Sequence, residues 1–377
     1  MKTLVAKHVP ELDGLRGIAI VSVIIHHQLT PFSLNGGFLG VDLFFVLSGF
    51  LITSLLWEEF RKTASISLRN FYMRRLLRLG PALAIYLAAS LLVTYRTQAI
   101  ELTRQLKLIA LAVFYSTNWR MAFGWDSTLD PTAIIWSLSI EEQFYLVWPL
   151  VLLGCLAVKL RRRFIAGGLV LIVLVIAIHR YSLLESGAEL TRLYYGTDTR
   201  ADALLVGCVF GLLHSKSSQW RTKTWLKVAS LLSAGGLGFL ILTAGFSDEL
   251  LYQGGFTAVA LLSGVVIFVA ANAPPRLLST ALRFMPLVWL GRISYGLYLW
   301  HWLVVRNTSF YSLGQWEPLA KLTIAVGIAA ASFYLIEKPF NQLKTRFAAR
   351  SPNPQSTSTK IPSENVTSGR TPLVVES

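Results

Sequence analysis

The chain has 377 residues, of which 54% are hydrophobic and only 15% are charged, and its mean hydropathy is +0.54. This composition excludes an ordinary soluble domain and predicts an all-α polytopic bundle in a lipid bilayer. The formal net charge of +15 does not indicate nucleic-acid binding, because the basic residues lie between apolar runs and positive-inside topology explains them better.

About ten apolar segments have roughly the length that a membrane span needs. Lys and Arg are concentrated in alternate connecting segments, which predicts that both termini are cytoplasmic. The apolar stretch 106–118 is shorter and is expected to be interfacial or re-entrant. The predicted spans are approximately 12–30, 37–56, 79–95, 134–157, 164–180, 200–214, 225–244, 254–272, 287–305 and 319–336.

These spans are expected to form one domain over residues 1–345. The segment 346–377 is rich in Ser, Thr and Pro and poor in aromatic residues. Such a composition cannot bury enough apolar surface to fold, so it predicts a disordered cytoplasmic tail.

The first span carries Arg16 and, eleven residues later, His27. Eleven helical steps of about 100° bring the two side chains to one face, about 16 Å apart along the axis. Ionisable groups at membrane depth usually face a bundle interior or a watery cavity. His26 lies about 80° off this face. The alternative is that Arg16 snorkels to the surface and His27 caps the outer end of the helix.

The second span contains Asp42, an acid close to a membrane boundary, in a segment rich in Gly and Ser. It is a candidate substrate contact, and an interfacial helix cap is the alternative.

Arg75 and Arg78 precede the third span and are neighbours on one helix face. Paired guanidinium groups bind phosphates in forked geometry. Topology anchoring and contact with lipid head groups are the alternatives.

The segment Trp136–Pro149 places Glu141, Glu142 and Gln143 inside an apolar span. Carboxylates at such a position are costly unless they are paired or protonated. One of them could pair with Arg16 or orient His27 as a general base. A purely structural ion pair is the alternative.

His301 lies in an aromatic-rich span, near its predicted outer end. It could contact the substrate or belong to the aromatic belt of the membrane interface. The two cysteines and six histidines show no spacing typical of a metal site, so no metal is expected.

Together these segments resemble the membrane acyltransferase 3 family. The resemblance covers about residues 10–345 in order. It is carried by Leu12–Gly17 with the gap to His27, Gly40–Ile52, Arg74–Arg78, Trp136–Tyr145, Ile293–His301 and Glu337–Pro339.

The resemblance implies a ten-helix membrane enzyme that moves an acyl group, usually acetyl, from cytoplasmic acyl-CoA to a hydroxyl group. Its acceptors include cell-surface polysaccharides, peptidoglycan, lipid-linked sugars and macrolides. It also implies that Arg16 and His27 are an essential pair and that Arg75 and Arg78 act together.

We therefore expect an O-acyltransferase of a bacterial plasma membrane that uses acyl-CoA, chiefly acetyl-CoA, and a glycan or glycoconjugate acceptor. Arg75 and Arg78 would hold the phosphates of the donor. His27 would deprotonate the acceptor or take the acyl group itself, oriented by Glu142 or by Glu141. The alternatives from other classes are a transporter of glycans or lipid-linked sugars and a non-catalytic glycan-binding relative. The paired broken helices of many transporters are not visible in the sequence.

Overall fold

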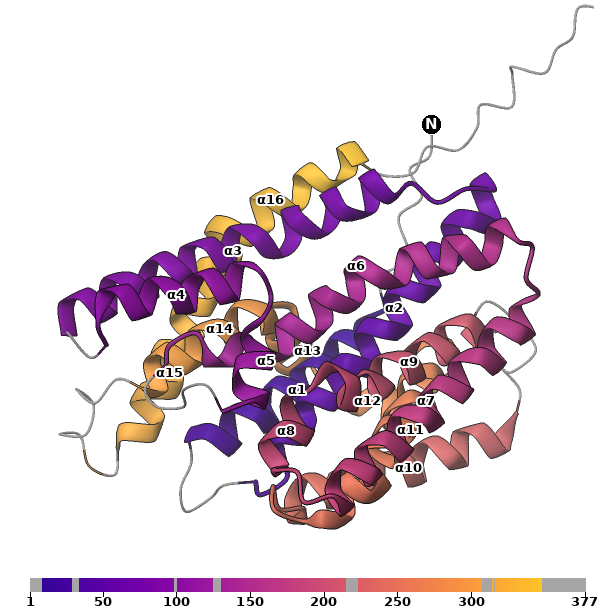
Figure 1. Cartoon of the computed structure of the whole chain (residues 1–377). Coiled ribbons are helices and arrows are strands. Elements are labelled where there is room, and N and C mark those ends of the chain that lie inside the picture. The colour runs from indigo at the N-terminus through magenta and orange to yellow at the C-terminus, as the bar shows by residue number, and fades with distance from the viewer. Residues whose placement is uncertain are drawn as a thin grey trace, which may run out of the picture.

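The computed structural model describes residues 9–28, 34–97, 100–124, 130–214, 223–306, 314 and 316–347. Within these ranges all the regular structure is helical, which confirms the predicted all-α class. Most of the long helices run in a similar direction, and α1 (Pro10–Gln28) lies near the middle of the bundle (Figure 1).

The other long helices form the rest of the bundle. They are α2 (Gly40–Thr63), α3 (Leu68–Thr97), α6 (Trp136–Ala157), α7 (Arg162–Glu185), α9 (Thr197–His214), α10 (Thr224–Thr243), α11 (Phe256–Asn272) and α15 (Glu317–Ser332). The shorter α-helices are α4 (Leu102–Val113), α5 (Thr117–Ala122), α8 (Leu190–Tyr195), α12 (Arg276–Leu282), α13 (Met285–Arg292), α14 (Ser294–Val305) and α16 (Lys338–Leu343). Turns of 3-10 or π-helix join them at η1 (Gly37–Leu39), η2 (Ala133–Ile135), η4 (Leu251–Gly255), η6 (Phe333–Glu337) and η7 (Lys344–Phe347).

Seven helical stretches in the described ranges are long and apolar enough to cross a membrane, so the chain is an integral membrane protein. They match seven of the predicted spans, and the other three predicted spans fall on α1, α9 and α13–α14. These three are shorter or more polar, and α1, α9 and α14 bury much of their surface inside the bundle. The helices that fit lipid least well are therefore the ones that carry Arg16, His27, Arg200 and His301.

The helix α1 packs directly on α13 through glycine contacts. A Cβ atom on Gly17 would lie 2.2 Å from the carbonyl oxygen of Leu287, and one on Gly291 would lie 1.8 Å from that of Asp13. Small residues allow helix backbones to approach this closely. The contact places Arg16 beside the start of α14.

The segment expected to be interfacial or re-entrant forms α4 and the turn into α5. Gln143 of α6 donates from Nε2 to the carbonyl oxygen of Tyr115, at 2.7 Å, and to Oδ1 of Asn118, at 2.9 Å. Asn118 in turn donates to the hydroxyl of Thr197, at 2.9 Å. These contacts attach the turn between α4 and α5 to α6 and α9, and the interfacial or re-entrant position of the segment stays a prediction.

A network of buried ion pairs joins α2, α7 and α9. Asp42 and Arg200 are 1% and 0% exposed, and their Oδ1 and Nη2 atoms lie 2.8 Å apart. Arg180 and Asp202 form a second pair at 3.0 Å, and Thr257 donates to the same Asp202 oxygen. A buried guanidinium group from a distant helix therefore holds the Asp42 carboxylate inside the bundle, and the contact of Asp42 with a substrate stays a prediction.

The predicted tail, 346–377, lies outside the described residues except at the end of η7. Its disorder and its cytoplasmic location remain predictions.

Candidate active site

Three cavities follow one another through the bundle. The inner cavity, of about 1000 Å³, reaches the start of α1 and the end of α16, and Lys344 and Arg292 line it. The arginine cavity, of about 70 Å³, shares Arg16 and Arg78 with it. The histidine cavity, of about 110 Å³, shares only Val41 and Tyr298 with the arginine cavity.

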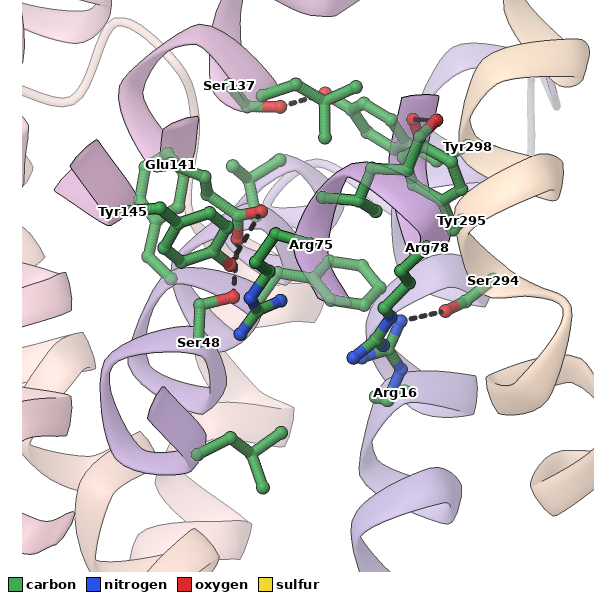
Figure 2. A pocket seen from close by; sticks show the side chains of 16 residues that line it. Arg16, Ser48, Arg75, Arg78, Ser137, Glu141, Tyr145, Ser294, Tyr295 and Tyr298 are labelled. Carbon is green, nitrogen blue, oxygen red and sulfur yellow. Dashed lines mark hydrogen bonds between the residues drawn. The ribbon is translucent and has the colours of Figure 1, made fainter. Parts of the chain in front are cut away.

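The arginine cavity brings together Arg16, Arg75 and Arg78 from α1 and α3. Figure 2 shows the guanidinium groups of Arg75 and Arg78 pointing away from the hydrogen-bonded pair of Ser137 and Tyr298. Arg16 donates to the carbonyl oxygen of Gly291, at 3.3 Å, and to the hydroxyl of Ser294, at 3.0 Å. Arg75 stacks over the ring of Tyr145, with 4.3 Å from its Cζ atom to the ring centroid.

None of these three arginines forms an ion pair with a carboxylate among the residues that the structure describes. Glu141 lines the same cavity, but its oxygens accept hydrogen bonds from Ser48, at 2.7 Å, and from Tyr145, at 3.3 Å (Figure 2). The cavity therefore holds an excess of positive charge that an anion could neutralise.

Tyr298 separates the arginine cavity from the histidine cavity. Its hydroxyl lies 2.6 Å from the hydroxyl of Ser137, and both atoms are buried. Beyond Tyr298, the histidine cavity is lined mainly by aromatic rings, with His26 and His27 among them.

His27 is held by α14. Its Nδ1 lies 3.2 Å from Nε2 of His301, and the two rings stack with their centroids 5.4 Å apart. Nδ1 of His301 lies 3.0 Å from the carbonyl oxygen of Leu297, and the His301 side chain is fully buried. The ring of Trp302 packs against His27 edge-on, at 5.3 Å. His26, off the shared face, contacts the carbonyl oxygen of Leu34 instead.

In the described part of the chain, the ring nitrogen Nδ1 of His27 contacts His301, and neither Glu141 nor Glu142 is hydrogen-bonded to His27. Glu142 lines a lateral cavity of about 280 Å³ between α3 and α6, together with Arg75 and Tyr115. Glu141 lies in the arginine cavity. Each of the two carboxylates therefore lines a cavity that Arg75 also lines. The imidazole of His301 lies beside His27, where a glutamate was expected.

Sequence reasoning missed Ser48, Ser294, Tyr298 and Trp302 as parts of the site. All four lie in the polar or aromatic motifs of the second and ninth predicted spans, so the sequence motifs already contain them. Their roles could not be predicted, because each one contacts a helix that is distant in sequence. Among the described residues, no group of three or more His, Cys, Asp or Glu side chains is arranged to hold a metal ion.

The sequence matches a family model described as an acyltransferase domain over residues 9–338. The chain is 36% identical over 357 residues to YrhL of Bacillus subtilis, and this match covers 90% of the chain and 56% of the relative. It is also 36% identical over 355 residues to the peptidoglycan O-acetyltransferase OatA of Listeria monocytogenes, with 89% of the chain and 56% of the relative covered.

The O-acetyltransferase OatA of Staphylococcus aureus is 35% identical over 355 residues, which cover 89% of the chain and 58% of the relative. The chain thus spans little more than half the length of these relatives. No solved structure matches it. These matches do not favour the transporter alternative. The family match over nearly the whole membrane domain shows that the chain belongs to the acyltransferase 3 family.

Proposed function

We propose that this acyltransferase moves an acetyl group from cytoplasmic acetyl-CoA to a hydroxyl group of a glycan on the opposite side of a bacterial plasma membrane. The observation that carries the proposal is the series of three cavities, in which arginines without carboxylate partners precede a histidine pair. The relatives named as peptidoglycan O-acetyltransferases support a cell-wall glycan as the acceptor.

The inner end of the series suits the donor. CoA carries several phosphate groups, and guanidinium groups bind phosphate with short, charge-assisted hydrogen bonds. Arg16 and Arg78 line both the inner and the arginine cavities, and Arg75 lines the second. Phosphates held in the inner cavity would leave the long pantetheine arm to extend past Tyr298.

The outer end suits the acceptor. His27 would take the proton of the acceptor hydroxyl while the hydroxyl oxygen attacks the thioester carbonyl carbon. The C–S bond breaks, the acetyl ester forms, and the thiolate of CoA leaves with the proton returned from His27. An intermediate in which His27 itself carries the acetyl group would give the same products.

The orientation follows from charge. Lys and Arg lie in the segments before α1 and after α16, and Arg61 and Lys62 lie in the last turn of α2, which favours a cytoplasmic location for these parts of the chain. In this orientation the inner cavity, with Lys344 and Arg292, would face the cytoplasm and His27 would lie toward the outer side.

The test uses inside-out membrane vesicles that contain the full chain and a soluble chitin oligosaccharide trapped in the lumen. Labelled acetyl-CoA added outside the vesicles should acetylate the trapped oligosaccharide. His27→Ala should lower the rate by about 10²- to 10⁴-fold, the usual effect of losing a general base. His26→Ala, whose ring contacts Leu34, should cause a smaller loss.

A rate that is equal in wild type and His27→Ala, with equal protein in the membrane, would contradict the proposal. So would acetylation that requires acetyl-CoA on the lumenal side.

A further inference from the structure

We propose that His301 is a positioning residue that fixes the tautomer of His27, so that Nε2 of His27 is the nitrogen left free to act as the base. The inference rests on the proposed function and goes beyond it, because it assigns the proton of each ring nitrogen in the pair.

The argument starts at Leu297, one helical turn before His301 on α14. Its carbonyl oxygen lies 3.0 Å from Nδ1 of His301. A carbonyl oxygen has no proton to donate, so Nδ1 of His301 must carry the hydrogen. In the neutral ring, the other nitrogen, Nε2, is then an acceptor.

The same rule then applies to His27. Its Nδ1 lies 3.2 Å from the acceptor Nε2 of His301, so Nδ1 of His27 must donate a proton in this contact. The remaining nitrogen of the neutral His27 ring, Nε2, therefore carries a lone pair. A chain from a backbone carbonyl through two imidazoles thus determines which nitrogen of His27 can accept a proton.

The surroundings hold this chain in place. His301 is fully buried, and its ring lies 22° from parallel with that of His27. Trp302 packs against His27 from another direction and donates through Nε1 to the carbonyl oxygen of Asp130. His27 therefore has little freedom to turn its ring and exchange the two nitrogens.

When His27 takes a proton at Nε2, its Nδ1–H stays bonded to the lone pair of His301. The imidazolium that forms keeps its acceptor, and His301 gains no charge. In this scheme His301 never touches the substrate and acts only through His27.

The first test compares two variants of similar size. In His301→Gln the amide oxygen can accept from Nδ1–H of His27, and the amide NH₂ can donate to the carbonyl oxygen of Leu297. In His301→Met neither hydrogen bond is possible. We expect kcat for transfer from acetyl-CoA to the chitin oligosaccharide to fall less than tenfold in His301→Gln and more than 100-fold in His301→Met. The KM for acetyl-CoA should change less than threefold in both, because the donor phosphates bind elsewhere.

A merely structural role would make the two variants lose activity together, in step with the amount of folded protein in the membrane, and this outcome would overturn the inference. His179→Gln is the matched control, because His179 lies on α7, is half exposed and pairs with Asp198.

The second test does not depend on activity. Nitrogen-15 solid-state NMR of the histidine-labelled chain in lipid bilayers distinguishes a protonated from an unprotonated ring nitrogen. The His27 signals, identified by their loss in His27→Gln, should show Nδ1 protonated and Nε2 bare in wild type and in His301→Gln. His301→Met should give a mixture of tautomers. A protonated Nε2 in the neutral ring of wild-type His27 would overturn the inference. A wild-type chain that transfers no acetyl group but shows the expected tautomer would instead reject the proposed function alone.

Discussion

Two groups of arginines in this bundle differ in what surrounds them. Arg180 and Arg200 each lie against an aspartate, and both pairs are almost fully buried. In the arginine cavity, Arg75 and Arg78 form no such pair within the described ranges. A charged side chain at membrane depth is costly unless it has a partner or faces a cavity.

The presence or absence of a partner carboxylate distinguishes arginines with a structural role from arginines that can bind a ligand. In a buried ion pair, each charge is compensated by its partner, and the pair holds two helices together. Guanidinium groups that face a cavity without a carboxylate partner keep their hydrogen bonds available for an anion.

Asp42→Ala should have the largest effect on folding. It leaves the guanidinium group of Arg200 buried without its carboxylate, and breaking such a pair costs about 3–5 kcal/mol. The loss should appear as less protein in the membrane and as a lower melting temperature in detergent. The double variant Asp42→Ala/Arg200→Met should recover part of the stability, because no unpaired charge remains. A single variant as stable as wild type would show that the pair does not hold the helices.

Arg75→Ala and Arg78→Ala should behave in the opposite way. Losing a charge-assisted phosphate contact should cost about 1.5–3 kcal/mol of donor binding, which raises the KM for acetyl-CoA by about 10- to 150-fold. The melting temperature should stay close to that of wild type, because neither substitution leaves a buried carboxylate without its ion-pair partner. A fall in stability with an unchanged acetyl-CoA dependence would instead make these arginines membrane anchors.

Glu141→Gln should have a smaller effect, with the opposite sign. The carboxylate lines the same cavity as Arg16 and Arg75, so its loss makes the cavity more positive. We expect the KM for acetyl-CoA to fall by about two- to fivefold, which corresponds to about 0.5–1 kcal/mol. Ser48→Ala removes a hydrogen bond to Glu141 but no charge, and should not lower this KM. A higher KM in Glu141→Gln would mean that the carboxylate itself positions the donor.

Lys344 should give the smallest effect, visible as a pH dependence. Burial and the nearby charges of Arg78, Arg75 and Arg74 lower the pKa of Lys344 to about 8. Its ammonium group is charged below this pH and neutral above it, and it lines the inner cavity. The KM for acetyl-CoA should therefore rise about two- to fivefold as the pH passes through about 8, the range expected for one partly exposed charge. Lys344→Gln should remove this rise, and a rise that persists in this variant would assign the titration to another group.

The parts of the fold that could be predicted are the helices whose sequences are apolar over a whole membrane span. Runs such as 164–180 and 254–272 are apolar over a whole span. The first lies in α7, and the second lies in the continuous stretch of η4 and α11. The predicted spans 12–30 and 200–214 have a weaker hydropathy signal, because Arg16, His27, Arg200 and Asp202 reduce their apolar character. The same ionisable residues favour a position of α1 and α9 inside the bundle. The residues that lower the hydropathy of these two segments therefore indicate the core of the bundle.

The candidate site could be predicted only within one helix. The spacing of Arg75 and Arg78 fixes a shared face, and both side chains line one cavity. The partner of His27 could not be predicted, because His301 is 274 residues away along the chain. Helical periodicity states which residues share a face, but it does not state which other helix packs against that face. For this reason Glu142 was as reasonable a partner from sequence as His301.

The thin partition at Tyr298 has an electrical consequence. If water fills the inner cavity, most of the membrane potential falls across the short stretch between the arginine and histidine cavities, where Val41 and Tyr298 are the shared walls. A unit charge that crosses a full potential of 100 mV exchanges about 2.3 kcal/mol with the field. Under the proposed function the phosphates of CoA stay on the inner side of this stretch, and only the uncharged pantetheine arm with its acetyl group enters it. The transfer would then do no net work against the membrane potential, and its rate would be the same in energised and de-energised membranes.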